Sequence, residues 1–199
     1  MRILKFHDTH IYVKELPSDI TPLLHLCDTE TQKKVKNVSS PRRQREIIAS
    51  HLMIKEIFND KATINHDEYG APIIIGIDGY ISTSHSATEI VIAFNPNHRI
   101  GIDIENWREQ LIKVRSRFLS QKEIEIYTSP QLLLQAWTIK EALYKVAQAP
   151  GISFDSDILL PNSLNSNISK VNTTKGICTF SFHIIESSPS RCITLAQPL

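Results

Sequence analysis

The stretch Arg99-Ile-Gly-Ile-Asp-Ile-Glu105 alternates strictly between isoleucine and other residues. This pattern predicts a β-strand around which the rest of the fold is built. Successive side chains of a β-strand point to opposite faces, so the isoleucines share one face while Gly101, Asp103 and Glu105 share the other. The apolar face predicts burial. The two carboxylates on the opposite face repel each other unless a cation or a shared proton lies between them. A hard divalent ion such as magnesium fits, since it prefers oxygen ligands and leaves room for a substrate phosphate. A solvated acidic edge strand is the simpler alternative.

The composition limits the class of protein. Of 199 residues, 41% are hydrophobic and 22% are charged, which is ordinary for a globular protein of one large domain or two small ones. A formal net charge of +1 argues against a nucleic-acid binder. The N-terminus lacks the apolar core of a signal peptide, and no apolar run approaches the roughly 18 residues of a membrane span, so we expect no membrane contact and a cytoplasmic location. Three cysteines without metal-ligand spacing fit reduced thiols.

Two long helices are expected because the same start signal occurs twice. Ser40-Pro41 and Ser129-Pro130 each place a serine cap before a proline at the first helical position, which predicts helices over about 41–58 and 130–147. Apolar alternation and turn residues predict the remaining elements: a strand over 3–13, a short helix over 29–38, a turn over 67–72, an apolar run over 73–77, a hairpin over 80–94, a capping box over 120–123 and two strands over 176–185 and 191–196.

The order of long helix, polar connection and hairpin thus occurs twice along the chain. We therefore predict an α+β fold built of two pseudo-symmetric halves, residues 1–97 and 98–199, with the active site in the cleft between them. Motifs on both sides of residue 97 support this division.

The first turns of the helix over 41–58 contain Arg42, Arg43 and Arg45, although the N-terminal end of a helix dipole is positive. A bound anion would offset this unfavourable placement, which indicates a phosphate site. Plain solvated arginines are the alternative.

The helix over 130–147 has two stripes rather than one. One stripe is apolar, and Trp137, Glu141, Tyr144 and Lys145 form a second stripe nearly opposite. Glu141 and Lys145 are one helical turn apart, so their side chains can reach a common point. An ordinary glutamate–lysine pair on a helix surface is the alternative. Ser84-His85-Ser86 does not predict a nucleophile with its base, because adjacent strand residues point apart.

Three separated motifs together resemble one family. Gly101-Ile-Asp-Ile-Glu105, Trp137-Thr-Ile-Lys-Glu-Ala-Leu-Tyr-Lys145 and Ser84-His85-Ser86, at these separations, resemble the 4′-phosphopantetheinyl transferases of the longer, monomeric Sfp-like class. The resemblance covers roughly residues 30–150. It implies an enzyme that moves the phosphopantetheine arm of coenzyme A onto a serine of an apo acyl or peptidyl carrier protein and releases 3′,5′-ADP with the help of magnesium.

The resemblance also implies roles for individual residues. The metal ligands fall on Asp103, Glu105 and Glu141, and the catalytic groups on Asp103, Glu141 and Lys145. The coenzyme A contacts fall on these residues: Ser84, His85, Lys140 and a basic cluster among Lys34, Lys36, Arg42, Arg43 and Arg45. Two positions depart from the family pattern, because Ala71 replaces a usual lysine and His51 a frequent arginine.

Partners and alternatives follow from the same residues. We expect a monomer that binds coenzyme A and the acidic surface of a carrier protein through the local basic cluster Lys113, Arg115 and Arg117. A different magnesium-dependent nucleotidyl or phosphoryl transferase is the main alternative function. A carrier-binding module that has lost catalysis is the other, and a coenzyme A binding assay with a turnover assay would separate the three.

Overall fold

The computed structural model describes residues 1–68 and 70–199. Its elements, in chain order, are β1 (Arg2–Phe6), β2 (Thr9–Glu15), the 3₁₀ helix η1 (Leu24–Leu26), α1 (Thr29–Lys36), α2 (Pro41–Phe58), β3 (Thr63–His66), β4 (Pro72–Ile75), β5 (Tyr80–His85), β6 (Glu89–Asn95), β7 (Gly101–Asn106), α3 (Gln110–Val114), the 3₁₀ helix η2 (Arg115–Arg117), α4 (Gln121–Ile126), α5 (Pro130–Ala147), β8 (Ile158–Leu159), β9 (Ile168–Thr173), β10 (Gly176–Ser188) and β11 (Arg191–Pro198).

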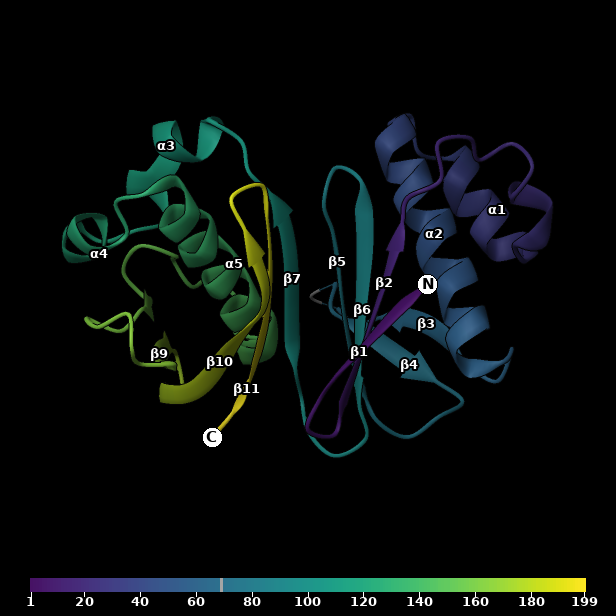
Figure 1. Cartoon of the computed structure of the whole chain (residues 1–199). Helices are drawn as coiled ribbons and strands as arrows, with labels where there is room; N and C mark the ends of the chain where they lie inside the picture. Colours follow the sequence, from purple (N-terminus) through teal and green to yellow (C-terminus); the bar gives the residue numbers. More distant parts are fainter. Residues whose placement is uncertain (69) are drawn as a thin grey trace.

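The strands form two larger antiparallel sheets (Figure 1). The first sheet has the order β1-β2-β6-β5, the second has the order β7-β11-β10-β9-β8, and β3 pairs with β4 in a separate ribbon. Every strand of the first sheet precedes residue 97 and every strand of the second follows it, so residues 1–97 are called the N-terminal half and residues 98–199 the C-terminal half. The predicted α+β class is confirmed. The two-fold relation between the halves stays a prediction.

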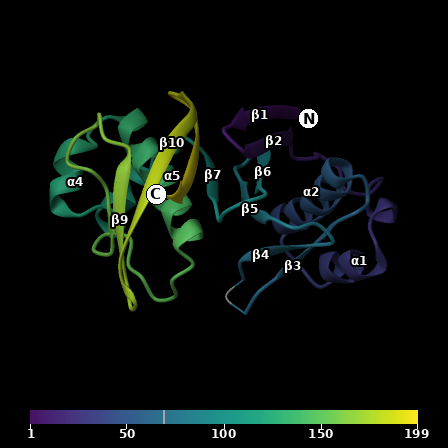
Figure 2. The ribbon, with the colours of Figure 1, turned by 90° about the horizontal axis from the view of Figure 1, so that it is seen from below.

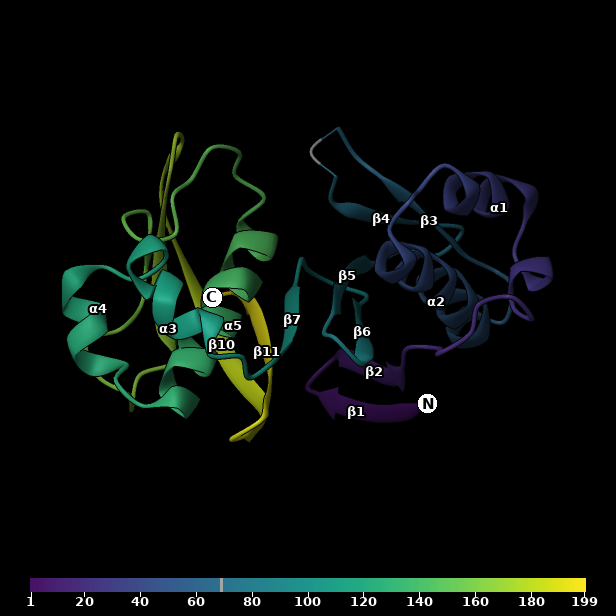
Figure 3. The same cartoon turned by 90° about the horizontal axis from the view of Figure 1, so that it is seen from above.

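The two sheets pack face to face, and the long helices cover their outer faces (Figure 3). Their shared core consists of apolar side chains from both halves: Ile11, Val13, Val91, Ala93, Ile100, Ile102, Ile104, Ile193 and Leu195. Helix α2 packs against the first sheet and α5 against the second. Seen from below, the edge strands β5 and β7 lie next to each other, between α2 and α5 (Figure 2). These two strands carry four of the predicted site residues: Ser84, His85, Asp103 and Glu105.

The long helices begin where the sequence predicts them to begin. The Ser40 hydroxyl accepts the Arg43 amide and the Ser129 hydroxyl accepts the Leu132 amide, so each serine caps its helix. The capping box between Ser120 and Glu123 is present as well. Cap chemistry is local, because the partners lie three residues apart.

Strand β7 is buried on both faces. Ile100, Ile102 and Ile104 face the first sheet and are at most 4% exposed, as predicted. On the other face, a Cβ atom added to Gly101 would lie 2.0 Å from the Ala142 carbonyl oxygen of α5. The glycine therefore allows α5 to approach the backbone of β7, which brings the polar stripe of α5 beside the acidic strand.

Two predictions of secondary structure were wrong. The single strand over 3–13 is a hairpin of β1 and β2, because His7 adopts a left-handed backbone with φ of 50° and turns the chain. The polar connection after Gly151 contains β8 and β9, whose backbone groups pair with each other and, through β9, with β10. Tyr69, inside the turn predicted over 67–72, lies outside the described residues. Among those residues, no helix combines the length and apolar character needed to cross a membrane.

Candidate active site

A cavity of about 630 Å³ opens between the two halves. The N-terminal half lines it with the first turns of α2, the end of β5 and residues 70–72, and the C-terminal half with β7, one face of α5 and residues 148–151. The cavity brings together these residues predicted from the sequence: Arg42, Ser84, His85, Asp103, Glu105, Glu141 and Lys145. Residues up to about 100 positions apart therefore meet at one site.

Asp103 lies at the centre of the polar contacts. It is 5% exposed, and its Oδ1 accepts hydrogen bonds from the Ser84 hydroxyl at 2.7 Å and from Lys145 Nζ at 2.8 Å. Lys145 Nζ also donates to the Ile102 carbonyl oxygen at 2.9 Å. Asp103 thus joins β5, β7 and α5, and two donors on one oxygen fit an ionised carboxylate.

The pKa of Glu141 lies well above the ordinary value of a glutamate. Burial raises the pKa of Glu141 to about 7, with a further rise from the charge of Asp103 and an opposing effect of Lys145. Burial also raises the pKa of Glu105, against the effect of Arg108, whose guanidinium donates to Glu105 Oε2 at 3.0 Å. A carboxylate that is about half protonated at neutral pH is suited to exchange protons with a ligand.

The three carboxylates Asp103, Glu105 and Glu141 have the donor chemistry for a hard divalent cation, because their oxygen atoms line one cavity. They are also close in space, since the charges of Asp103 and Glu105 add to the effect of burial on the pKa of Glu141. Their present contacts are different. Among the described residues, no three histidine, cysteine or acidic side chains are gathered as a ligand cluster, since Lys145 holds Asp103 and Arg108 holds Glu105. The metal-ligand set stays a prediction.

His85 is held in its neutral form. Its Nε2 lies 3.0 Å from the Ser50 hydroxyl, and burial lowers its pKa to about 4, with Glu46 opposing and Arg43 adding to the effect. The neighbouring Ser84 bonds Asp103 instead. This divergence agrees with the expectation that these adjacent strand residues do not form a nucleophile and base.

Sequence reasoning missed Glu46, which is 8% exposed and holds two arginines at the mouth of the cavity. Glu46 Oε1 accepts Arg42 Nε at 2.9 Å and Oε2 accepts Arg43 at 3.1 Å. Burial opposes ionisation of Glu46, but these hydrogen bonds keep its pKa below the usual value. The carboxylate offsets part of the unfavourable placement of the arginines, for which the sequence suggested either a bound anion or plain solvation. The signal was present in the sequence, because Glu46 stands three and four positions after the arginines.

Lys140, predicted to contact coenzyme A, occupies a different place. Its side chain is fully buried, and Nζ donates at 2.7 Å to Glu123 Oε2 and, at the same distance, to the carbonyl oxygens of Phe154 and Ile158. Lys140 does not line the cavity. Lys140 directly precedes Glu141 on α5, so its side chain leaves the helix about 100° away from that of Glu141. It therefore points to the loop after α5 and not into the cavity. The structure therefore gives it a structural role.

Three other basic residues of the predicted cluster also lie outside the cavity lining. Lys34 pairs with Glu30 at 2.8 Å on the surface of α1, Lys36 is exposed at the end of that helix, and Arg45 lies further along α2. His66 also lines the cavity, although the sequence did not indicate it. Burial lowers the pKa of His66, and the nearby charge of Lys34 lowers it further.

The two departures from the family pattern differ in position. Ala71 lines the cavity, so the missing lysine charge would have been at the site. His51 lies outside the lining and its Nδ1 is 3.1 Å from the Thr31 hydroxyl. The Nε2 of His51 is buried and has no hydrogen-bond partner among the described residues.

Fold and site together define an α+β protein whose two halves enclose a cavity with carboxylates on one side and arginines on the other, a combination suited to a phosphorylated ligand. A model of the 4′-phosphopantetheinyl transferase superfamily matches residues 99–196, which run from the start of β7 into β11. The C-terminal half of the chain thus matches this superfamily.

A curated relative agrees with this assignment. The chain is 27% identical over 151 residues to the 4′-phosphopantetheinyl transferase gsp of Aneurinibacillus migulanus, and the match covers 72% of the chain. It spans 63% of that relative's length.

Proposed function

We propose that the chain transfers the 4′-phosphopantetheine arm of coenzyme A to a serine of an apo acyl or peptidyl carrier protein. The carrier serine oxygen forms a bond to the phosphorus that bears the arm. The bond from that phosphorus to the bridging oxygen of the diphosphate breaks, and its electron pair leaves with 3′,5′-ADP. The observation that carries the proposal is the convergence of Ser84 and Lys145 on Asp103 in a cavity that two arginines also line, in a chain whose C-terminal half matches this superfamily.

The residues of the N-terminal half would bind the nucleotide part of coenzyme A. Arg42 and Arg43 are more than half exposed at the cavity, so their guanidinium groups are free to turn from Glu46 towards phosphate oxygens. Neutral His85 and the Ser84 hydroxyl would bind nearer the diphosphate. These groups fix the position of the leaving nucleotide.

The residues of the C-terminal half would act on the transferred phosphoryl group. Glu141 has a pKa of about 7 and would accept the proton of the carrier serine, directly or through water. A phosphate in the cavity competes with Asp103 for Lys145 Nζ, and Lys145 would donate to its oxygens as negative charge develops. Asp103, Glu105 and Glu141 would hold magnesium, which neutralises charge on the diphosphate when it is bound.

The carrier protein would dock on the basic cluster of Lys113, Arg115 and Arg117, which is exposed on α3 and η2. Ile112 beside it is 45% exposed and adds an apolar contact. The net charge of +1 is too small to steer an acidic partner to the protein as a whole, so a local patch is required. We propose that the protein works as a monomer in the cytoplasm.

The test is incubation with coenzyme A, magnesium and a panel of apo carrier proteins, followed by intact-mass measurement of each carrier. The expected result is a gain of the phosphopantetheine mass on at least one carrier, with equimolar 3′,5′-ADP, and loss of the gain on chelation of the metal. The Asp103→Asn variant serves as the matched control and should give no mass gain while it keeps the wild-type circular dichroism. A wild-type protein that binds coenzyme A but modifies no carrier would support the inactive binding module instead.

A further inference from the structure

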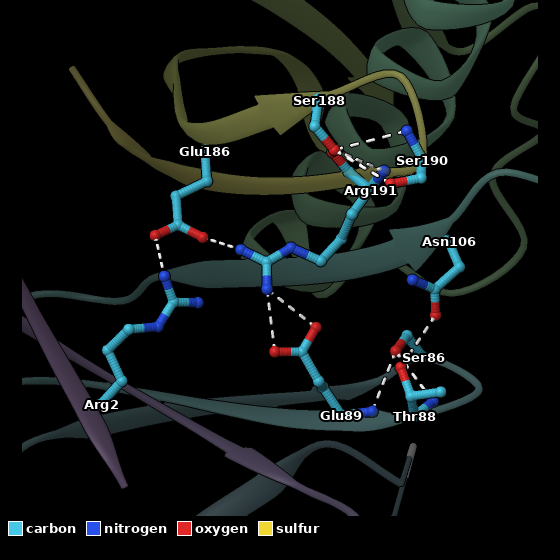
Figure 4. A network of polar contacts seen from close by, with 9 residues as sticks. All are labelled: Arg2, Ser86, Thr88, Glu89, Asn106, Glu186, Ser188, Ser190 and Arg191. Atoms are coloured by element: carbon cyan, nitrogen blue, oxygen red, sulfur yellow. Dashed lines mark hydrogen bonds and ion pairs between the residues drawn. The ribbon is translucent and has the colours of Figure 1, made fainter.

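Four charged residues link the two halves at one end of the molecule (Figure 4). Both Arg191–Glu89 contacts, from one guanidinium nitrogen to the two carboxylate oxygens, measure 2.8 Å. The other terminal nitrogen of Arg191 donates to Glu186, whose second oxygen accepts from Arg2. We call Arg2, Glu89, Glu186 and Arg191 the inter-half clamp.

The clamp connects the two halves through two contacts, Arg2–Glu186 and Arg191–Glu89. Arg2 on β1 and Glu89 on β6 belong to the first sheet, whereas Glu186 on β10 and Arg191 on β11 belong to the second. The Arg191–Glu89 contact is partly shielded from water, since the side chains of Arg191 and Glu89 are 23% and 17% exposed. A hydrogen bond of 3.4 Å from the Thr88 hydroxyl to Asn106 Oδ1 crosses the same boundary nearby.

The clamp is attached to the strand ends that carry the candidate active site. Glu89 follows His85 in the β5–β6 hairpin, whose turn is fixed because the Ser86 hydroxyl accepts the Glu89 amide at 3.1 Å and the Ser86 amide donates to the Glu89 carbonyl at 2.8 Å. Arg191 is directly opposite Asn106 in the β7–β11 ladder, and Cys192 is opposite Glu105. Holding Glu89 against Arg191 therefore holds the Ser84–His85 hairpin against the acidic end of β7.

The apolar core between the sheets cannot supply this alignment by itself. Burial of isoleucine, valine and leucine side chains favours contact between the sheets, but it is non-directional. A hydrogen-bonded pair of arginine and carboxylate fixes both distance and direction. An exposed ion pair would contribute little, but this one is partly buried and belongs to a network.

We infer that Arg191 is a positioning residue, which through Glu89 sets the relative placement of the two sides of the active site. The inference rests on the proposed function. The groups that would bind the nucleotide, Arg42, Arg43 and His85, all belong to the N-terminal half, so coenzyme A should still bind when the clamp is broken. The groups that would act on the phosphoryl oxygens, Asp103 and Lys145, belong to the other half. Loss of the clamp should therefore lower kcat and leave KM for coenzyme A nearly unchanged, since a displacement of about 1 Å can cost about 10²-fold in rate.

The experiment measures carrier modification and coenzyme A binding for five variants of the full chain. Arg191→Gln and Glu89→Gln should each lower kcat by about 10–100-fold, with KM and the calorimetric Kd for coenzyme A within about threefold of wild type. Arg191→Lys keeps a positive charge that can make one of these contacts. Its kcat should therefore lie between those of Arg191→Gln and wild type. The matched control is Arg2→Gln, which removes the exposed outer member of the clamp and should leave kcat within about twofold. Because Arg191 and Glu89 act as a unit, the double variant Arg191→Gln/Glu89→Gln should be no worse than Arg191→Gln.

A second measurement does not depend on turnover. In Arg191→Gln, backbone amides of the β5–β6 hairpin and of the end of β7 should exchange with deuterium faster than in wild type, and those in Arg2→Gln should not. Unchanged exchange together with a kcat within about twofold of wild type in both Arg191→Gln and Glu89→Gln would overturn the inference. A drop in melting temperature with unchanged kcat would reduce the clamp to a stabilising contact. If the wild-type protein modifies no carrier, the proposed function fails, and hydrogen exchange alone decides whether the clamp aligns the halves.

Discussion

Replacing Lys140 by methionine should destabilise the fold strongly, because its ammonium group has no access to water. Lys140 Nζ donates to Glu123 and to two carbonyl oxygens, and Glu123 in turn accepts the Leu160 amide at 2.8 Å and the Ser120 amide at 2.7 Å. Methionine fills a similar volume but leaves the Glu123 carboxylate buried without a counter-charge. Breaking a buried pair in this way costs about 3–5 kcal/mol of unfolding free energy. For a protein of this size the melting temperature should fall by roughly 6–20 °C.

A double variant identifies the cause. A variant that also removes the Glu123 charge tests whether the buried carboxylate left without a counter-charge is responsible for the loss.

Urea unfolding followed by circular dichroism at neutral pH provides the measurement. The matched control is Lys122→Met on α4, where the lysine is exposed, and its unfolding free energy should stay within about 0.5 kcal/mol of wild type. The double variant Lys140→Met/Glu123→Gln removes both charges and should be at least about 1 kcal/mol more stable than Lys140→Met. A loss below about 1 kcal/mol for Lys140→Met would refute the reasoning.

Further predictions concern the cavity and its surroundings. His85 has a pKa of about 4 in the folded protein and an ordinary value of 6.5, so the unfolded chain binds more protons between these values and stability should fall by up to about 3 kcal/mol as the pH drops from 6.5 to 4. His85→Gln should flatten that dependence in urea titrations, and an unchanged slope would contradict it. Lys145→Ala should lower kcat by about 10²–10³-fold, whereas near-normal turnover would leave Lys145 only its contact with the β7 backbone and carboxylate. The double variant Arg42→Ala/Arg43→Ala should raise KM for coenzyme A more than it lowers kcat, and an unchanged KM would mean that the arginines are merely solvated. Reversing two charges within residues 113–117 should slow association with an acidic carrier and weaken its salt dependence in stopped-flow measurements, and rates equal to wild type at low and high salt would place docking elsewhere.

The sequence by itself determined the features that depend on near neighbours along the chain. The starts of α2 and α5 follow from serine caps whose partners lie three residues away. The alternation of residues 99–105 determined which side chains of β7 enter the core between the sheets. The helical period placed Glu141 and Lys145 on one stripe, and both line the cavity.

Tertiary structure alone decided which charged residues of different elements meet. Lys140 and Lys145 lie in one motif, but only packing shows that the first is buried beside Glu123 while the second reaches Asp103 in the cavity. Arg191 and Glu89 are 102 positions apart, and nothing in their local sequence indicates that they meet. Hydrophobic periods and caps report the face that a residue occupies within its own element. The partner across the face depends on how two elements pack, and that contact is encoded by the whole core rather than by any short stretch.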